Sequence, residues 1–539
     1  MQGVQLDEKR RAAEAARGIW PQRVLTGYFD QWVADRPEAI ALIGHRHRSG
    51  DIMTMSYGEL DRRATAIAAN LRRLGVRKGD VVSFQLPNWW QFPALLIANT
   101  RIGAVNNPMM PIFRHRELSF MLAQAGSKVF IAPSSFRNFD HGRLALQLHE
   151  EIDGLDHVLL IDGEGGNSFE QVLLEENHDP LPEGCGADPD GVTQLLFTSG
   201  TTGEPKGVMH TSNTLIGTTL QFAARMGLGE NEIIFMPSPF AHQAGYEYGA
   251  LLALLIGAPL IMQDVWDPAT ARDLIARYKA TYTFASTPFL ADLAALEGVQ
   301  PDDMPDFRLF VTSGAPIPPA VVAAAQERLG ITVVGGWGMS ECGILTTTEL
   351  SGHKVRESDG HALPGSQVRV VDEAGNEAPR GQEGRFQIRG TGLFVGYLKR
   401  PDLYDIDEEG WFDTGDLARM DEEGYIRITG RSKDIIIRGG ENIPVVEVEN
   451  ALYNMPQVAD CAIVAMPDPR LGERGCVFIL PKPFADIDME AMRAHLASQG
   501  ISKSYWPERL EIVDEMPRTA SGKIQKFVLR ERARQFAAS

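Results

Sequence analysis

The sequence predicts an α/β protein made of several structural units, and three observations point to this class. The chain has 539 residues, which is too many for one hydrophobic core, since domains average about 150 residues. Its first 190 residues alternate helical segments such as 57–74 with short apolar strands such as 81–84 and 129–132. This alternation is typical of a largely parallel sheet covered by helices. After residue 350 the pattern changes, so a second kind of unit is expected.

The last third of the chain is expected to form a small β-rich unit followed by a mixed unit. Short alternating strands with glycines at their ends are expected at 367–372, 384–390 and 424–430. From about Asp434 the pattern is mixed again. Helices are expected at 447–454 and 489–498, and a strand at 458–466.

The composition is that of an ordinary globular protein and excludes several partners. Hydrophobic residues make up 44% and charged residues 23% of the chain. The longest apolar stretch, 250–262, is too short for a membrane span of about 20 residues and is broken by Gly257 and Pro259, so a core helix turning into a strand is expected there, and no integral membrane association. The net charge of −19 argues against nucleic acid and anionic membrane surfaces as partners. The charged N-terminus lacks the apolar part of a secretory signal, so a cytoplasmic location is expected.

The four cysteines are expected to be reduced thiols. They are scattered without a C-x-x-C pair, which favours neither a disulfide framework nor a zinc site.

The segment 198–207, which reads Thr-Ser-Gly-Thr-Thr-Gly-Glu-Pro-Lys-Gly, is the most informative part of the sequence. It follows a run at 192–197 that reads as a buried strand, and open α/β sheets bind ligands where their strands end. Its glycines let backbone N–H groups approach an anion, its hydroxyls add donors, and Lys206 adds a positive charge. The P-loop pattern does not fit, because Pro205 precedes the lysine and Gly207 follows it. A flexible linker is the plainer alternative, but it has no need of the lysine, so a nucleotide-phosphate loop is predicted.

Seven further motifs follow this loop in order along the chain. They are 239–245 (PFAHQAG), 313–316 (SGAP), 336–341 (GWGMSE), 411–416 (WFDTGD), 430–434 (GRSKD), 439–442 (GGEN) and 517–523 (PRTASGK). With the loop, they resemble the adenylate-forming superfamily of acyl-CoA synthetases, peptide-synthetase adenylation domains and beetle luciferases over essentially the whole chain. The resemblance implies a large N-terminal domain, residues 1–432, of two α/β subdomains and a small β-barrel-like subdomain. A small mobile α+β C-terminal domain, residues 433–539, would follow it.

The resemblance also implies a site for ATP and AMP. The segments 313–316 and 337–339 are expected to contact adenine, as a small-residue edge and an aromatic face. Asp416 and Arg431 are expected at the ribose, although Asp416 beside a glycine would by itself read as a turn residue. Trp337 stands where the family often has tyrosine, which keeps a stacking face but loses the phenol. The nucleotide contacts implied in full are Thr198, Ser199, Gly200, Thr201, Thr202, Gly203, Lys206, Ser313, Gly314, Ala315, Pro316, Trp337, Gly338, Met339, Ser340, Glu341, Asp416, Arg431 and Lys523.

The implied reaction has two steps. A carboxylate attacks the α-phosphorus of ATP and pyrophosphate leaves; the thiol of CoA then attacks the acyl-adenylate and AMP leaves. Lys523 resembles the lysine that bridges carboxylate and α-phosphate, with Lys206 at the phosphates and His242 at the acyl group as further catalytic residues. Glu341 resembles the ligand of Mg²⁺, the implied cofactor. Without the resemblance, Lys523 would read as a surface lysine and His242 as a structural histidine.

The second step implies a movement of the C-terminal domain. Lys433 holds the family's hinge position, and Gly439 and Gly440 would form the wall of a tunnel for CoA. An ordinary turn that ends a strand is the alternative for the paired glycines. Cys342 is expected to be a small packed residue, because the reaction needs no protein nucleophile.

The implied acyl pocket consists of His242, Ala244, Gly245, Tyr246, Ser286, Trp337 and Met339. Small residues leave width near the carboxylate, while Tyr246 and Trp337 limit depth, which favours a cyclohexanecarboxylate-like or medium-chain acid. Three alternatives stay open: loading of a carrier-protein phosphopantetheine, a luciferase-like oxygenase, and a non-catalytic nucleotide-binding module. The expected partners are the acid, ATP, CoA and a lysine acetyltransferase acting on Lys523, with a homodimer as one candidate assembly.

Overall fold

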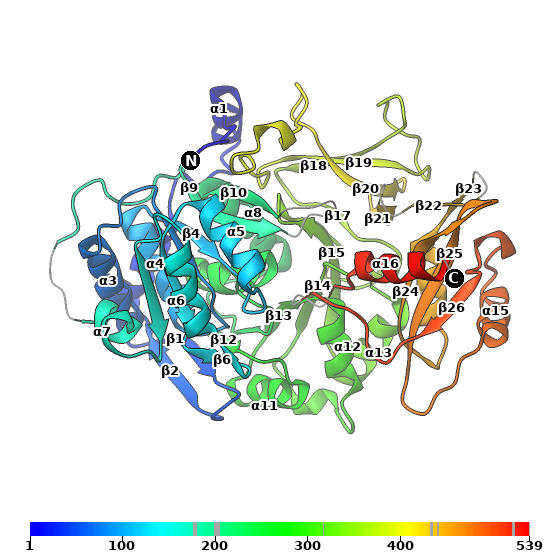
Figure 1. The fold of residues 1–539 in the computed structure, drawn as a ribbon, viewed down its shortest axis with the longest axis horizontal. Coiled ribbons are helices and arrows are strands. Elements are labelled where there is room, and N and C mark those ends of the chain that lie inside the picture. The colour runs from blue at the N-terminus through cyan, green and yellow to red at the C-terminus, as the bar shows by residue number, and fades with distance from the viewer. Residues whose placement is uncertain are drawn as a thin grey trace.

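Two large sheets and the helices packed on them form the larger part of the computed structural model (Figure 1), which describes residues 1–175, 180–198, 205–315, 317–431, 435–438, 441–519 and 523–537. The first sheet contains β1 (Ile40–His45), β2 (Ile52–Ser56), β11 (Ile234–Met236), β12 (Leu260–Gln263), β13 (Tyr282–Ala285), β14 (Leu309–Thr312), β15 (Thr332–Met339), β16 (Gly343–Thr347) and β17 (His361–Ala362). The second contains β3 (Val81–Phe84), β4 (Val105–Pro108), β5 (Ser127–Pro133), β8 (His157–Ile161), β9 (Val192–Thr198) and β10 (Lys206–Thr211).

Both sheets are largely parallel, and antiparallel pairs lie at three of their four edges. The strand orders are β17-β16-β15-β14-β13-β11-β12-β1-β2 and β10-β9-β4-β3-β5-β8. Antiparallel pairing is confined to β1 with β2, the β15-β16-β17 edge, and β9 with β10. The expected α/β class with largely parallel sheets is confirmed.

Helices cover these sheets and fill the space between them. They are α2 (Leu25–Asp35), α3 (Tyr57–Arg73), α4 (Gln91–Ile102), α5 (His115–Ala125), α6 (His141–Glu151), α7 (Phe169–Leu173), α8 (Ser212–Met226), α9 (Gln243–Gly245), a π-helix (Tyr246–Leu251), α10 (Leu252–Ile256), α11 (Pro268–Tyr278), α12 (Thr287–Ala295) and α13 (Pro319–Leu329), whereas α1 (Glu8–Ala16) lies beside the β-rich unit described below. Local chemistry explains their ends: the Ser56 side chain accepts the Glu59 backbone N–H at the start of α3, and two arginines occupy its last turn.

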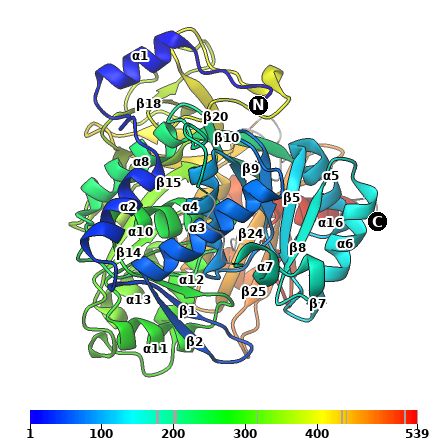
Figure 2. The same cartoon turned by 90° about the vertical axis from the view of Figure 1, so that its left-hand side faces the viewer.

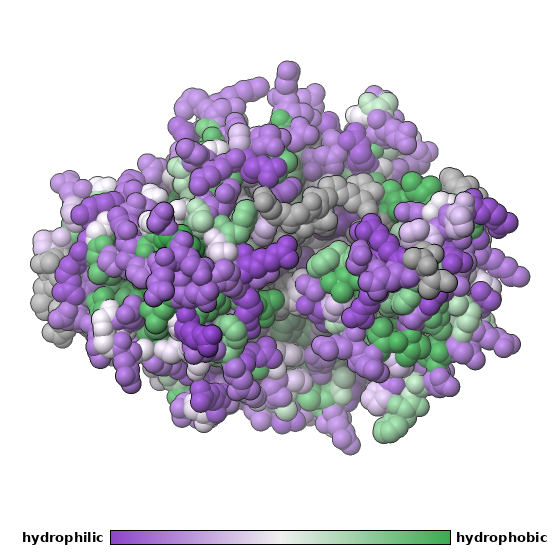
Figure 3. Space-filling model, in the orientation of Figure 1, coloured by the Kyte–Doolittle hydropathy of each residue, from purple (hydrophilic) through white to green (hydrophobic). Residues whose placement is uncertain are grey.

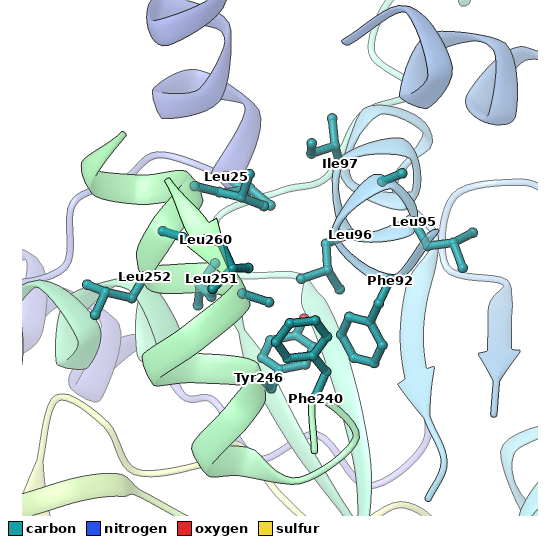
Figure 4. Close-up of a cluster of buried hydrophobic side chains, with 14 of the residues drawn as sticks. Leu25, Phe92, Leu95, Leu96, Ile97, Phe240, Tyr246, Leu251, Leu252 and Leu260 are labelled. Atoms are coloured by element: carbon teal, nitrogen blue, oxygen red, sulfur yellow. The ribbon is translucent and has the colours of Figure 1, made fainter. Parts of the chain in front are cut away.

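The main hydrophobic core lies between the two sheets. Helix α4 is buried at every position except Arg101, which is typical of a helix inside a core. Figure 4 shows Phe92 of α4 against Phe240 and Tyr246, with ring centroids 5.1 and 6.1 Å apart. The expected change from core helix to strand is confirmed, since α10 ends at Gly257 with φ of +73° and β12 follows. This core fixes the segment from Phe240 onward, which carries several expected site residues.

The expected β-rich unit is a four-stranded antiparallel sheet in the order β18-β19-β20-β21. Its strands are β18 (Ser366–Val371), β19 (Gly384–Gly390), β20 (Phe412–Met420) and β21 (Ile426–Arg431). Helix α1 lies beside this unit in both views (Figures 1 and 2), and the Arg10 guanidinium donates to the carbonyls of Leu393 and Phe394.

The C-terminal unit contains β22 (Ile436–Arg438), β23 (Glu441–Ile443), β24 (Val458–Asp468), β25 (Gly472–Pro481) and β26 (Arg509–Ile512), with helices α14 (Val445–Tyr453), α15 (Met489–Ser498) and α16 (Lys526–Ala537). One hydrophobic cluster joins the sheet to α14 and α15, and another joins it to α16. The unit therefore has cores of its own. The domain boundary after residue 432 stays a prediction, because Lys433 lies outside the described residues.

The surface is predominantly hydrophilic on the face shown in Figure 3, with hydrophobic residues in scattered areas. Within the described residues, no helix is long and apolar enough to cross a membrane.

Candidate active site

The predicted phosphate loop connects the two strands of a hairpin. Strands β9 and β10 pair antiparallel, with Thr198 opposite Lys206, and β9 also pairs parallel with β4. Lys206 therefore starts a strand instead of a helix, in agreement with the exclusion of a P-loop. The expected loop contacts Ser199, Gly200, Thr201, Thr202 and Gly203 lie outside the described residues.

Lys523 of the C-terminal unit lies against Gly314 of the large domain. A Cβ atom at Gly314 would stand 3.1 Å from Lys523 Cε and 3.7 Å from Nζ, so the glycine leaves room for the lysine side chain. The Lys523 backbone is held in turn by Thr519, whose hydroxyl accepts the Lys523 N–H over 3.1 Å. The predicted catalytic lysine is thus held at the surface of the larger domain.

Burial lowers the pKa of Lys523 to about 8. The nearby Arg431 lowers it further, while Asp416 and Glu341 oppose the shift. The lysine is therefore charged at neutral pH, but its proton is held less tightly than that of a surface lysine.

Asp416 is held by two donors on opposite sides of its carboxylate. The Trp337 indole donates from Nε1 to Oδ2 over 2.8 Å, and Arg431 Nε lies 3.0 Å from Oδ1. Asp416 and Arg431 are paired residues of β20 and β21, so the sheet register brings them together. Burial raises the pKa of Asp416, and Arg431 and the indole counteract the rise. Asp416 is a buried, oriented acceptor, which suits the expected role at the ribose.

Glu341 lies among groups that fit a magnesium ligand. The Tyr397 hydroxyl donates to its Oε1 over 2.7 Å, and the Lys206 ammonium stands 5.1 Å from the centre of the Tyr397 ring. Burial raises the pKa of Glu341, while Tyr397, Lys206 and Arg431 lower it. The described residues hold no cluster of three or more ligating side chains. A single carboxylate fits Mg²⁺ that takes its other ligands from phosphates and water.

A small cavity of about 60 Å³ contains part of the expected acyl pocket. Its lining consists of Ser238, His242, Gln243, Ala244, Tyr248, Phe284, Ser286, Ser313, Gly314, Gly338, Met339, Ser340, Gly343, Ile344 and Lys523. Four of the expected residues, His242, Ala244, Ser286 and Met339, are among them.

Three residues expected in the acyl pocket do not line this cavity. Tyr246 is only 3% exposed and packs in the core against Phe92 (Figure 4). Gly245 packs against the backbone of Pro239, where a Cβ would approach the carbonyl oxygen to 2.3 Å. Trp337 faces a different cavity. The expectation that Tyr246 and Trp337 limit the depth of the pocket is therefore corrected.

Tyr248 and Phe284 line the cavity instead of the expected Tyr246 and Trp337. Their rings stack at 4.6 Å with an interplanar angle of 23°, and both line the cavity. The position of Tyr248 was not predicted because the segment Tyr246–Leu251 is a π-helix, which no simple periodicity predicts. Phe284 lies on β13, and no motif in the sequence marks it.

His242 is a neutral group in this cavity. Its Nδ1 accepts the backbone N–H of Ala244 over 3.3 Å. Burial, reinforced by the charge of Lys523, lowers its pKa to about 3. His242 is therefore uncharged at neutral pH and adds no second positive charge beside Lys523.

A second and larger cavity, of about 380 Å³, lies between the two domains. Its lining includes the expected nucleotide contacts Ser313, Gly314, Ala315, Trp337, Gly338, Asp416, Arg431 and Lys523, together with Val445, Glu447 and Asn450 of α14. It shares Ser313, Gly314, Gly338 and Lys523 with the first cavity. Lys523 thus stands where the two cavities meet.

Two further contacts, which the sequence did not predict, hold the segment that carries Ser340 and Glu341. His210 of β10 lies with Nε2 at 2.7 Å from the Ser340 carbonyl, and the Phe394 N–H donates to the Glu341 carbonyl over 2.8 Å. Burial lowers the pKa of His210 to about 4. These pairs are far apart in sequence, so no local signal could have indicated them.

Pro316, Lys433, Gly439 and Gly440 lie outside the described residues. Cys342 is buried, and burial raises its pKa well above the ordinary value, in agreement with a packed thiol.

Comparison with known proteins identifies the family. The model of the AMP-binding enzyme family matches residues 29–398, and that of the AMP-binding enzyme C-terminal domain matches residues 447–523. The chain is 35% identical to the medium-chain fatty-acid–CoA ligase of Escherichia coli K12 over 534 residues, covering 97% of this chain and 93% of the relative. It is 30% identical to a salicylyl-CoA synthase / salicylate adenylyltransferase of a Streptomyces species over 548 residues, covering 98% of each. ATP-bound MatB from Rhodopseudomonas palustris superposes with a TM-score of 0.85 at 28% identity, covering 96% of this chain and 100% of that one.

Proposed function

Since this chain belongs to the AMP-binding enzyme family and is an AMP-forming acyl-CoA synthetase, we propose that its acid is a medium-chain or alicyclic, cyclohexanecarboxylate-like acid and that CoA is its acceptor. The position of Lys523 at the junction of the two cavities is the observation that carries the proposal. The acid would occupy the first cavity and the nucleotide the second. Their reacting groups would then meet beside the lysine.

Lys523 would supply the charge that the first step needs. The carboxylate and the α-phosphate are both anionic, so their approach requires a cation placed before the reaction starts. Gly314 gives the lysine side chain its place, and the neutral His242 next to it can line the pocket without adding a second cation.

The remaining polar groups would hold the nucleotide. Asp416, oriented by Trp337 and Arg431, would accept hydrogen bonds from the ribose. Glu341, oriented by Tyr397, would hold Mg²⁺, which compensates the charge of the phosphates. Lys206 lies on the same side of the site, close to the Tyr397 ring, and would contact phosphate oxygens.

The apolar side chains that line the first cavity support an apolar acid. About 60 Å³ remain when Lys523 is in place, and the stacked rings of Tyr248 and Phe284 form part of the wall. The name of the Escherichia coli relative adds support for a medium-chain acid.

The second step would require the C-terminal domain to move. Lys523 occupies the junction in this conformation, so a thiol that attacks the acyl-adenylate needs the lysine to leave. Lys433 as the hinge and Gly439 with Gly440 as the wall of the CoA tunnel stay predictions.

Loading of a carrier protein is the second candidate for the thiol step. The Streptomyces relative is named both a CoA synthase and an adenylyltransferase, so its name pairs the CoA step with adenylation as an activity of its own.

A screen for ATP–pyrophosphate exchange with linear C4 to C12 acids, cyclohexanecarboxylate and benzoate tests the proposed acid. Exchange that is strongest with a medium-chain or alicyclic acid is the expected result, and strongest exchange with an aromatic or long-chain acid would contradict it. The preferred acid is then offered with CoA or with a phosphopantetheinylated carrier protein. Acyl-CoA formation is expected, and transfer to the carrier protein alone would favour the second candidate.

A further inference from the structure

A buried carboxyl group lies directly behind the acyl cavity, and the two-step chemistry makes no use of it. Glu247 is 1% exposed and belongs to the π-helix Tyr246–Leu251. A buried carboxyl group costs free energy unless it is well hydrogen-bonded, so its contacts indicate what it does.

Two of its partners are side chains that line the cavity. Gln243 donates from Nε2 to Glu247 Oε2 over 2.8 Å, and Tyr248 is hydrogen-bonded to the same carboxyl group. A third donor, the hydroxyl of Thr219 on α8, reaches Oε1 over 3.2 Å from outside the cavity. Glu247 therefore connects two wall residues to the helix behind them.

The carboxyl group lies immediately behind Gly343 of the cavity wall. A Cβ atom at Gly343 would stand 2.6 Å from Glu247 Oε2 and 2.8 Å from the Tyr248 hydroxyl oxygen. Gly343 also has φ of +64°, which disfavours other residues. No side chain at this position separates the cavity from the carboxyl group.

Glu247 belongs to the acyl part of the site and not to its reacting end. The charged groups that act on Lys523 are Arg431, Asp416 and Glu341. Among the residues that the structure describes, Glu247 forms no ion pair with a lysine, arginine or histidine, and its hydrogen-bond partners are neutral. Burial raises its pKa to about 8.

We propose that Glu247 is a specificity-determining residue, which acts by holding Gln243 and Tyr248 in the positions that close the acyl cavity. This rests on the proposed function of that cavity as the acyl pocket. Without the carboxyl group, both wall residues lose a partner and the space behind Gly343 opens. A longer acid then fits where the wild-type wall excludes it.

The test compares Glu247→Ala and Glu247→Gln by ATP–pyrophosphate exchange with linear acids from C4 to C12. In Glu247→Ala we expect the preferred chain to lengthen and KM for the wild type's preferred acid to rise about tenfold, the effect of about one methylene group in a pocket. The kcat for the preferred acid and KM for ATP stay close to wild type. Glu247→Gln keeps the size and an acceptor oxygen, so it retains the wild-type profile.

Two further variants keep the test decisive. Glu247→Met preserves volume without hydrogen bonds to Gln243 and Tyr248, and it is expected to fold and to broaden the range of acids accepted even if Glu247→Ala unfolds. Glu232→Ala removes another buried, hydrogen-bonded glutamate that does not line the cavity, and it is expected to lower stability without changing the profile. An unchanged profile in folded Glu247→Ala or Glu247→Met would overturn the inference while leaving the acyl-CoA synthetase function intact. If instead the wild type responds neither to this series nor to cyclohexanecarboxylate, the proposed acid itself is wrong.

Discussion

The indole N–H of Trp337 donates a hydrogen bond to Oδ2 of Asp416 over 2.8 Å. Tryptophan stands here where adenylate-forming enzymes often have tyrosine, and its indole nitrogen orients Asp416, the carboxylate proposed to bind the ribose. The ring is held on its other side by Phe386, edge to face with centroids 4.8 Å apart. Because Asp416 is only 5% exposed, the hydrogen bond is made in a place where water cannot easily replace it.

Trp337→Phe is expected to weaken ATP binding without changing the acyl pocket. A hydrogen bond to a charged group contributes about 1.5–3 kcal/mol, so KM for ATP should rise about 10- to 100-fold. The KM for the acid should change little, since Trp337 faces the second cavity alone. Exchange kinetics with each substrate varied in turn measure both. An equal rise of the two KM values would point to a general disturbance of the fold.

Lys523→Ala is expected to separate the two half-reactions. Acyl-AMP formation should be lost, because Lys526 is the one other lysine among the described residues that line either cavity, and it pairs with Glu449 over 2.6 Å. Conversion of supplied acyl-AMP and CoA should continue. Pyrophosphate exchange measures the first step and thioester formation the second. Loss of both in a folded protein would remove Lys523 from its assigned role.

The first step should depend on pH through Lys523. Its pKa is lowered to about 8, so the charged form dominates below pH 8 and is lost as the pH rises through that value. The kcat/KM for pyrophosphate exchange, which reports free-enzyme pKa values, should therefore fall above pH 8. The arginine in Lys523→Arg stays charged over this pH range. The variant should therefore be less active than the wild type, but its kcat/KM should not decrease above pH 8. A wild-type profile that is flat to pH 10 would contradict the assignment.

Tyr397→Phe is expected to raise the Mg²⁺ concentration needed for half-maximal exchange. The variant keeps the ring beside Lys206 but removes the hydroxyl that orients Glu341. Loss of a side chain that hydrogen-bonds a metal ligand typically lowers the affinity for the metal about 10-fold. Titration of Mg²⁺ at saturating ATP measures the effect. As a control, Tyr404→Phe removes another hydroxyl, which contacts the Arg10 side chain, and should leave the Mg²⁺ requirement unchanged.

Acetylation of Lys523 by a lysine acetyltransferase should abolish adenylation without unfolding the protein. The modification removes the charge and adds bulk beside Gly314, where the lysine already fits closely. Because the side chain is half-buried in this conformation, saturating ATP and acid should slow its modification. Mass spectrometry combined with the exchange assay measures both. Full activity in protein that is completely acetylated at Lys523 would end the regulatory role and the catalytic one.

The local sequence was sufficient for the fold class and for the prediction of a phosphate loop around Lys206. Alternating helices and strands predict parallel sheets, and α3 and β3 lie where periodicity placed them, because burial of one face leaves a repeat in the sequence. Glycines, hydroxyls and Lys206 in one segment indicate phosphate by their chemistry, whereas the expected roles of Glu341, Asp416 and Lys523 came from the resemblance of their motifs to the adenylate-forming superfamily. Such motifs can be recognised in a sequence because residues that are close along the chain lie in the same loop or at the same strand end.

The tertiary structure alone decided which of these groups meet and which aromatic residues shape the acyl pocket. Tyr246 and Tyr248 look equivalent in the sequence, yet the π-helix turns the first into the core and the second to the cavity. Trp337 reaches Asp416, Tyr397 reaches Glu341 and Lys523 reaches Gly314 across long separations in the chain. These contacts depend on how whole sheets and domains pack, and packing is a sum over many distant side chains that leaves no repeat in any one segment.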